Sequence, residues 1–226
     1  MEGILEMNFA PYSISKIQVY NSCPRSFKFK YIDKLPEADK DCFKKGRAIH
    51  KVLETYPTIS KDSVVEKFLN SSVGKKYSEY VKESKKCMKE TKIALTVDLK
   101  PTNFFAKDAW FRGIVDLMFV NDNTLYLCDY KTGKVKDLKD QDFSQLIYYA
   151  LYFFTTYKYI QKVKLSFIYV EHNTENVLEL SRESCETFIQ QLKQNIKAIE
   201  NDSEFVSKKS WKCNYCSFKS QCETKC

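Results

Sequence analysis

The sequence predicts an α/β domain in which a central mixed β-sheet is flanked by helices. Two segments rich in β-branched and aromatic residues, 111–120 and 124–131, enclose a turn made of Asn and Asp, which is typical of a β-hairpin. A helical pattern over 138–157 and an apolar strand at 163–170 follow. A strand, a crossover helix and a second strand form a βαβ unit with parallel strands. Antiparallel and parallel pairs in one sheet make the sheet mixed.

Composition allows one large domain, or one domain with a small appendage. The chain has 226 residues, of which 43% are hydrophobic and 15% aromatic, enough for a sizeable core. No apolar run of about 18 residues predicts a transmembrane helix, and the N-terminal residues lack the features of a signal peptide. The net charge of +8, with basic clusters at 44–47, 85–86 and 208–209, favours a polyanionic partner, nucleic acid first.

The N-terminal segment 13–32 predicts two short helices. Ser13 or Ser15 is a suitable N-cap for the first helix, and Pro24 suits the first turn of the second. Cys23 lies at the joint between them. Taken alone, such a cysteine is more often a buried structural thiol than a ligand.

The segment 43–56 predicts an amphipathic helix that carries one of the two histidines of the chain. His50 lies on the flank of its apolar stripe. A lone histidine in this position is usually a satisfied surface or core residue, so His50 becomes a ligand candidate only through its neighbours. The stripe consists of Ile49, Val52, Leu53 and Tyr56.

Four further segments complete the predicted order of elements. Residues 60–92 predict two lysine-rich helices without identifiable chemistry, and 93–99 predict a strand that precedes the hairpin in the same sheet. After the βαβ unit, a short strand near 177–180 and an amphipathic helix over 182–199 complete the body of the domain.

The hairpin brings three charged side chains to one face. With Asp122 and Asn123 as the loop residues, Asp116 lies opposite Asp129, and facing residues of an antiparallel pair have Cβ atoms roughly 5 Å apart. Because side chains alternate along a strand, Lys131 joins the face of Asp129. Two carboxylates and a lysine on an apolar hairpin are costly in a core, so the sequence predicts a metal site there.

Cysteines are unusually numerous, with nine in the chain. Without a secretory signal a disulfide framework is not expected, and four cysteines within 213–226 indicate a soft-metal site. The spacing leaves two interpretations open. A local zinc knuckle would use Cys213, Cys216, Cys222 and Cys226, whereas an iron–sulfur cluster would use three of these and one distant thiol.

Four short motifs follow one another along the chain: Gly46-Arg47-Ala48-Ile49-His50, Gly113-Ile114-Val115-Asp116, Asp129-Tyr130-Lys131 and Gln145-Leu146-Ile147-Tyr148-Tyr149. In this order they resemble the motifs of the RecB-like branch of the PD-(D/E)XK nucleases. Cys23-Pro24-Arg25, together with the C-terminal Cys-x2-Cys-x5-Cys, resembles the frame of the iron–sulfur subgroup. That subgroup includes the CRISPR-associated RecB-like exonucleases and the nuclease domain of AddB. The resemblance extends from about Ser13 to Cys222.

The resemblance implies a restriction-endonuclease-like fold and a divalent metal, Mn²⁺ or Mg²⁺. Lys131 would be the catalytic lysine, and we assign it first to electrostatic stabilisation. The metal would be held by His50, Asp116, Asp129 and the backbone carbonyl of Tyr130.

The resemblance also gives roles to the following helix and to the cysteines. Gln145 and Tyr149 would shape the active site and help to place DNA. A [4Fe–4S] cluster would tie residue 23 to the C-terminal segment, with Cys226 as a spare thiol. Its ligands would be Cys23, Cys213, Cys216 and Cys222.

We therefore expect a metal-dependent DNA exonuclease in the cytoplasm of a prokaryotic cell, encoded by the cell or by a phage. Its substrate would be single-stranded DNA or DNA ends, in recombination and repair, CRISPR spacer acquisition or phage DNA metabolism. We expect one nuclease domain over 1–226, with a mainly helical part at 13–92, a core at 93–200 and a cysteine-rich segment at 205–226 that packs against the Cys23 region.

The alternative is a non-catalytic, zinc- or iron–sulfur-containing DNA-binding subunit of a larger helicase–nuclease or CRISPR adaptation complex. The chain has no Gly-x4-Gly-Lys-Ser/Thr phosphate loop, so ATP-driven unwinding would need a helicase partner. A CRISPR integrase is the other partner to consider.

Overall fold

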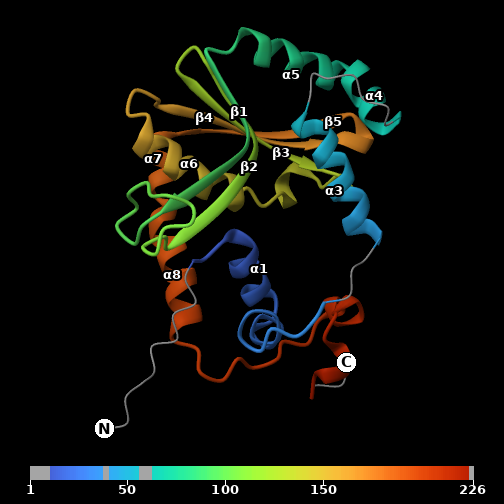
Figure 1. Cartoon of the computed structure of the whole chain (residues 1–226), viewed down its shortest axis with the longest axis vertical. Helices are drawn as coiled ribbons and strands as arrows, with labels where there is room; N and C mark the ends of the chain where they lie inside the picture. Colours follow the sequence, from blue (N-terminus) through green and yellow to red (C-terminus); the bar gives the residue numbers. More distant parts are fainter. Residues whose placement is uncertain (1–10, 38–40, 56–62, 224–226) are drawn as a thin grey trace. The chain divides into compact units, whose positions relative to one another are not determined.

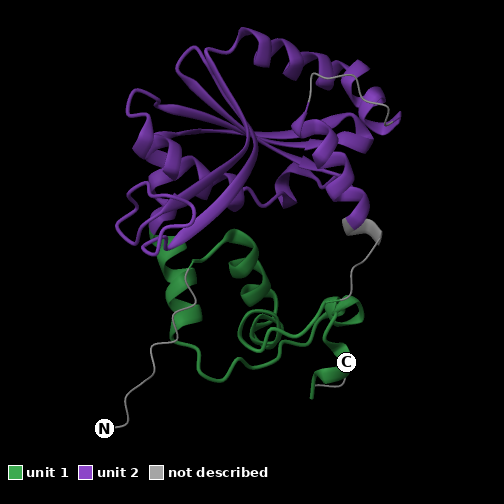
Figure 2. Cartoon of the chain, viewed as in Figure 1, with its two compact units in different colours: residues 1–39, 190–226 green, residues 40–189 purple. Residues whose placement is uncertain are grey.

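The computed structural model describes residues 11–37, 41–55 and 63–223. The chain forms two compact units, one made of residues 40–189 and the other of residues 1–39 and 190–226 (Figure 2). Two residues of the sequence-based predictions lie outside the described residues. Tyr56 is the last residue of the predicted helix stripe, and Cys226 is the last cysteine of the C-terminal group.

The larger unit is built on a five-stranded sheet with the strand order β1-β2-β3-β4-β5 (Figure 1). The β1–β2, β2–β3 and β4–β5 pairs are antiparallel, whereas β3 and β4 are parallel. This confirms the predicted mixed sheet and its βαβ unit. The strands are β1 (Lys86–Leu95), β2 (Phe111–Asn121), β3 (Thr124–Lys131), β4 (Lys162–Tyr169) and β5 (Thr174–Ser181).

Helices cover both faces of this sheet. In Figure 1, α4 (Ser63–Asn70) and α5 (Ser72–Glu83) lie on one side of the sheet and α6 (Ser144–Thr156) on the other. The short elements η2 (Leu138–Asp140), η3 (Val170–His172) and α7 (Arg182–Glu186) complete the larger unit. The apolar stripe of α3 (Asp41–Glu54) fits the predicted pattern, because Ile49 and Leu53 are buried. They share one core cluster with Val65, Phe68, Tyr77, Leu117, Phe119, Cys128, Tyr130, Ile168 and Val170.

The start of β1 corrects the sequence-based assignment. The helical prediction for residues 60–92 is wrong from Lys86 onward, because β1 begins there and pairs with β2. Residues 86–92 include Lys, Met and Glu, which favour helices, so local propensity points away from a strand. β1 is an edge strand, and pairing with β2 overrides that propensity.

The smaller unit joins the two ends of the chain. Ser13 caps α1 (Ile14–Ser22) by accepting a hydrogen bond from the backbone N–H of Lys16 (3.3 Å). The rings of Phe27 and Phe205 stack with centroids 6.0 Å apart, and the Tyr20 hydroxyl donates to a carboxylate oxygen of Asp202 at 2.8 Å. The other elements are α2 (Pro24–Phe27), the π-helical η1 (Lys28–Ile32), α8 (Phe188–Glu200), whose first two residues belong to the larger unit, η4 (Trp211–Tyr215) and η5 (Lys219–Gln221).

None of the helices in the described part of the chain has the length and apolar character needed to cross a membrane.

Candidate functional site

The β2–β3 hairpin has the predicted register. Asp122 and Asn123 form its loop with positive φ values of 46° and 61°, conformations that Asn and Asp tolerate better than most residues. Backbone pairing continues inward from this turn as far as Leu117 and Cys128, one pair short of Asp116 and Asp129. The strands therefore separate where the two predicted acids lie.

Beyond the last backbone pair of the ladder, the side chain of Asp116 bonds to β3 in place of a backbone group. Its Oδ2 atom accepts a hydrogen bond from the backbone N–H of Tyr130 at 2.8 Å. The same oxygen lies 3.3 Å from Nδ1 of His50, whose Nε2 lies 2.9 Å from the carbonyl oxygen of Tyr130. The hydrogen bond with Asp116 is the main reason why the pKa of His50 is raised, against the opposing effect of burial. The packed stripe of α3 thus places His50 at the end of β3.

Asp129 is held by two other predicted residues. Its Oδ2 atom lies 2.6 Å from Nζ of Lys131, and its Oδ1 atom accepts a hydrogen bond from the side-chain amide of Gln145 at 2.6 Å. Burial, and then the nearby charge of Asp116, raise the pKa of Asp129 to about 6, against the opposing effect of Lys131. The ammonium group of Lys131 also lies 4.8 Å from the centre of the Phe167 ring. Asp129 is therefore the link between the hairpin and α6.

A glutamate that the sequence reasoning missed joins this group. Glu90 lies on β1 between the pairs Lys89–Leu117 and Thr91–Val115, so it is opposite Asp116. Its φ of 43° is unusual for glutamate, and such strained residues are common at functional sites.

Ligand atoms of Glu90, His50 and Asp116 lie within 4.8 Å of one another. Burial, and then Asp116, raise the pKa of Glu90. Had residues 86–95 been recognised as a strand pairing with β2, Glu90 would have been a candidate.

The donor set fits a hard divalent cation. An imidazole nitrogen and two carboxylates form the group of three, and the carbonyl oxygen of Tyr130 lies next to His50. Oxygen-rich sites suit Mg²⁺ and Mn²⁺, and an imidazole is compatible with Mn²⁺. Asp129 lies outside this group of three, and both of its oxygens contact other side chains. Of the four predicted ligands, His50 and Asp116 thus belong to the closest cluster.

Tyr149 supports the site from α6. Burial raises the pKa of its hydroxyl, against the opposing effects of the neighbouring Gln145 side chain and Ile114 backbone. Its ring packs directly on Gly113, where a Cβ atom would lie only 2.2 Å from Cε1 of the ring. The motif that contains Gly113 and the motif that contains Tyr149 therefore contact each other in the folded chain.

An open groove adjoins the acidic cluster. It has a volume of about 340 Å³ and is lined by α3 residues, among them Arg47, His50 and Lys51, and by Glu90 of β1. Gly46, at the same groove, lies close to Thr132, since a Cβ there would be 3.3 Å from the threonine hydroxyl. The ligand candidates His50 and Glu90 are thus open to solvent on a partly cationic side.

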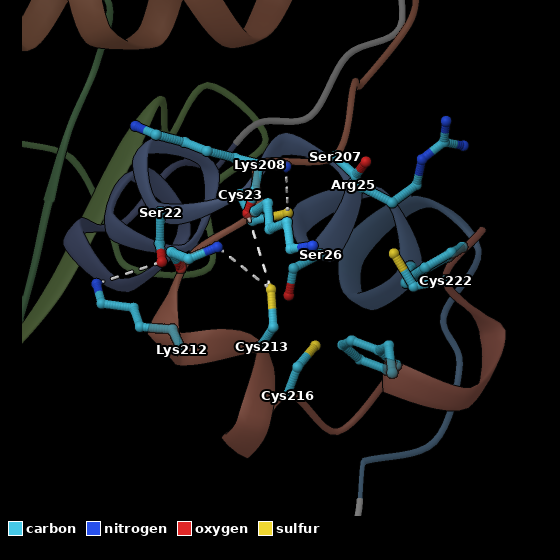
Figure 3. A pocket seen from close by; sticks show the side chains of 14 residues that line it. Ser22, Cys23, Arg25, Ser26, Ser207, Lys208, Lys212, Cys213, Cys216 and Cys222 are labelled. Atoms are coloured by element: carbon cyan, nitrogen blue, oxygen red, sulfur yellow. Dashed lines mark hydrogen bonds between the residues drawn. The ribbon is translucent and has the colours of Figure 1, made fainter. Parts of the chain in front are cut away.

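The cysteine frame forms a separate cavity in the smaller unit (Figure 3). Its volume is about 100 Å³. The backbone N–H of Lys208 donates to Sγ of Cys23 at 3.4 Å, which joins the N-terminal and C-terminal segments. Four cysteines that form no disulfide line the cavity: Cys23, Cys213, Cys216 and Cys222.

A mixed sheet with an acidic, metal-compatible cluster and a lysine at its strand ends is typical of hydrolases that cut phosphodiesters. The chain belongs to the PD-(D/E)XK nuclease superfamily, whose family model matches residues 11–223. Nucleases of this superfamily use divalent metals such as Mg²⁺ or Mn²⁺, which agrees with the donor set.

The chain is also similar to a solved structure described as "Crystal structure of SSO0001". The two share 15% sequence identity with a TM-score of 0.48, over 93% of this chain and 85% of the other. Comparison with curated proteins finds no match.

Proposed function

We propose that this protein is a metal-dependent DNA exonuclease that hydrolyses phosphodiester bonds in single-stranded DNA or at DNA ends. The observation that carries the proposal is the convergence of His50, Glu90 and Asp116 beside the Asp129–Lys131 pair. A protein that only binds DNA has no use for clustered acids near its anionic ligand. The non-catalytic alternative therefore has less support.

We propose that the metal ligands are the predicted residues together with Glu90. A bound divalent ion would act as a Lewis acid and neutralise part of the negative charge of the phosphate. Before an ion binds, the Asp116 carboxylate and the Tyr130 carbonyl flank the two ring nitrogens of His50. The predicted ligands are His50, Asp116, Asp129 and the backbone carbonyl of Tyr130.

The other residues act on the phosphate and on the ligands. The ammonium group of Lys131, 2.6 Å from Asp129, is placed to stabilise the negative charge that develops on the phosphate or to orient the attacking water. Gln145 fixes the orientation of the Asp129 carboxylate by donating a hydrogen bond to it, and Tyr149 lies beside Gln145 on the same helix. In this scheme Lys131 acts on the reacting groups, whereas Gln145 and Tyr149 are positioning residues.

The test is digestion of DNA that carries a label at the 5′ or the 3′ end, with Mn²⁺ or with EDTA. An exonuclease releases labelled mononucleotides or short fragments early from one end only, and EDTA stops it. Internal fragments from both labels at the earliest times would identify an endonuclease instead. Absence of cleavage with Mn²⁺ and with Mg²⁺ would leave the DNA-binding alternative.

We further propose that Cys23, Cys213, Cys216 and Cys222 hold a [4Fe–4S] cluster that ties the two ends of the chain together. Cysteines more than 180 residues apart line one cavity, as the resemblance to the iron–sulfur subgroup requires. The cavity wall also suits the negative charge of a thiolate-bound cluster. Its cations are Arg25, Lys208, Lys209 and Lys212.

Purification without oxygen tests this proposal. The protein should be brown and contain about four iron and four sulfide per chain. Cys213→Ala should lose the colour and become less stable, whereas Cys87→Ala, at an exposed cysteine of β1, should keep both. A colourless wild type with one zinc ion per chain would establish the zinc interpretation.

With this cluster, we propose that the protein belongs to the RecB-like iron–sulfur branch. A role in recombination and repair, in CRISPR spacer acquisition or in phage DNA metabolism follows from that proposal. A helicase or a CRISPR integrase would then be its partner. Co-purification of the tagged protein with one of these two enzyme classes from its own cell tests the partner.

A further inference from the structure

The loop between β1 and β2 presents an aromatic pair to solvent. Phe104 and Phe105 pack edge to face, with ring centroids 5.1 Å apart at 80°. Phe105 is 72% exposed, although phenylalanine is normally a core residue. Packing in the hydrophobic core therefore does not account for the position of Phe105.

The loop holds this pair in a defined position. The backbone N–H of Phe105 donates to the side-chain oxygen of Asn103 at 2.9 Å, and the N–H of Ala106 donates to the carbonyl of Asn103 at 3.0 Å. The hydroxyl of Thr102 donates to Asp108 at 2.9 Å, which closes the loop on itself. Little conformational entropy remains to be lost when a flat ligand stacks on Phe105.

Two cations flank the rings. Nζ of Lys92 lies 5.8 Å from the Phe104 centroid and 5.3 Å from the Phe105 centroid, and the guanidinium carbon of Arg112 lies 5.2 Å from the Phe104 centroid. Among the described residues, neither cation forms a salt bridge with an acid. Nε of Arg112 is buried and has no hydrogen-bond partner there, whereas its Nη2 group donates to the carbonyl oxygen of Ala106 at 3.3 Å. The exposed Lys92 therefore presents its charge to an anion, and the half-buried Arg112 adds a positive charge that no described acid pairs with.

The paired strands place these groups in a row that starts at the acidic cluster. Lys92 pairs with Ile114, one two-residue step of about 7 Å from Glu90 and Asp116. Arg112 follows one further step along β2. Ile114 is 41% exposed, so apolar surface lies between the acids and the aromatic pair.

We propose that this row, the strand track, binds an unpaired nucleic-acid strand that runs from the acidic cluster to the β1–β2 loop. It consists of Lys92, Phe104, Phe105, Arg112 and Ile114. A base stacks on the ring of Phe105, and Lys92 and Arg112 contact the backbone phosphates. Aromatic rings among cations are typical of single-strand binding, because the faces of unpaired bases are free to stack.

The strand track deepens the proposed function, because it explains a preference for single strands. A protein partner is the other occupant to consider. The cations favour a polyanion, and the row leads to the residues proposed to cut a phosphodiester. An apolar protein surface would leave Lys92 and Arg112 without counter-charges.

Fluorescence anisotropy with a labelled oligonucleotide tests the strand track, in EDTA so that nothing is cut. Phe105→Ala should weaken single-strand binding about tenfold and leave blunt duplex binding unchanged, and Phe105→Trp should restore it. Lys92→Ala or Arg112→Ala should each reduce the salt dependence of single-strand binding, by about 0.7 in the log–log slope. Tyr159→Ala, at a ring that is 57% exposed and outside the track, is the matched control and should bind as the wild type does.

Wild-type affinity in Phe105→Ala, or an equal loss for single strands and duplex, would overturn the proposal. The proposal would also be overturned if the labelled oligonucleotide does not bind and a protein binds to the same surface. The readout does not depend on cleavage. Phe105-dependent binding by a protein that never cuts DNA would therefore refute the proposed hydrolysis and leave the strand track standing.

Discussion

Replacing Gly113 by alanine would place a methyl group where the ring of Tyr149 now lies. The ideal Cβ position is 2.2 Å from Cε1 and 2.7 Å from Cζ, against at least 3.4 Å in an ordinary contact. The φ of Gly113 is not positive, so the clash, and not the backbone, requires glycine. The ring must retreat by about 1.2 Å within a packed core, which costs about 1–3 kcal/mol of unfolding free energy.

A double-mutant cycle isolates this contact. Tyr149→Ala alone should cost about 3–5 kcal/mol by leaving a cavity. In a chain that already carries Tyr149→Ala, adding Gly113→Ala should cost nothing more, so the coupling between the two sites should be about 1–3 kcal/mol. Urea unfolding of the metal-free protein measures all four corners. Additivity within about 0.5 kcal/mol would refute the reasoning.

Two other predictions concern the acidic cluster. Glu90→Gln should raise the dissociation constant for Mn²⁺ at least about tenfold by calorimetry, because a charged ligand is lost. Glu54→Gln, in the same groove but outside the group of three, should bind as the wild type does. In EDTA, the raised pKa values of Asp129 and His50 mean that the folded state holds more protons than the unfolded state. Asp116 contributes to both shifts. As pH rises from about 5 to about 8, the melting temperature of the wild type should therefore fall relative to that of Asp116→Asn. A rise of the wild-type melting temperature relative to that of the variant would contradict this.

The central hairpin was predictable because its turn is local chemistry. Asp122 and Asn123 accept positive φ, and that fixes the register that brings Asp116 and Asp129 together. The parallel pairing of β3 and β4 was predictable for a related reason, since a helix of suitable length separates two apolar strands.

Glu90 could not be found in the same way. Its strand lies at a sheet edge, and its lysines and glutamate resemble a solvated helix. Only the pairing with β2 shows that Glu90 faces Asp116. The strand track could not be predicted from the sequence for the same reason. The residues around Lys92 resemble a helix, and the contact between Lys92 and Phe105 depends on the conformation of the loop.

The most direct measurement of the central claim is single-turnover cleavage of labelled single-stranded DNA by Lys131→Ala beside the wild type, with Mn²⁺ bound to both. Because Lys131 contacts Asp129 but lies outside the group of three ligand candidates, the variant should keep its Mn²⁺ affinity and lose cleavage by at least about a hundredfold. Cleavage at the wild-type rate by the Mn²⁺-loaded variant would contradict the account of this site.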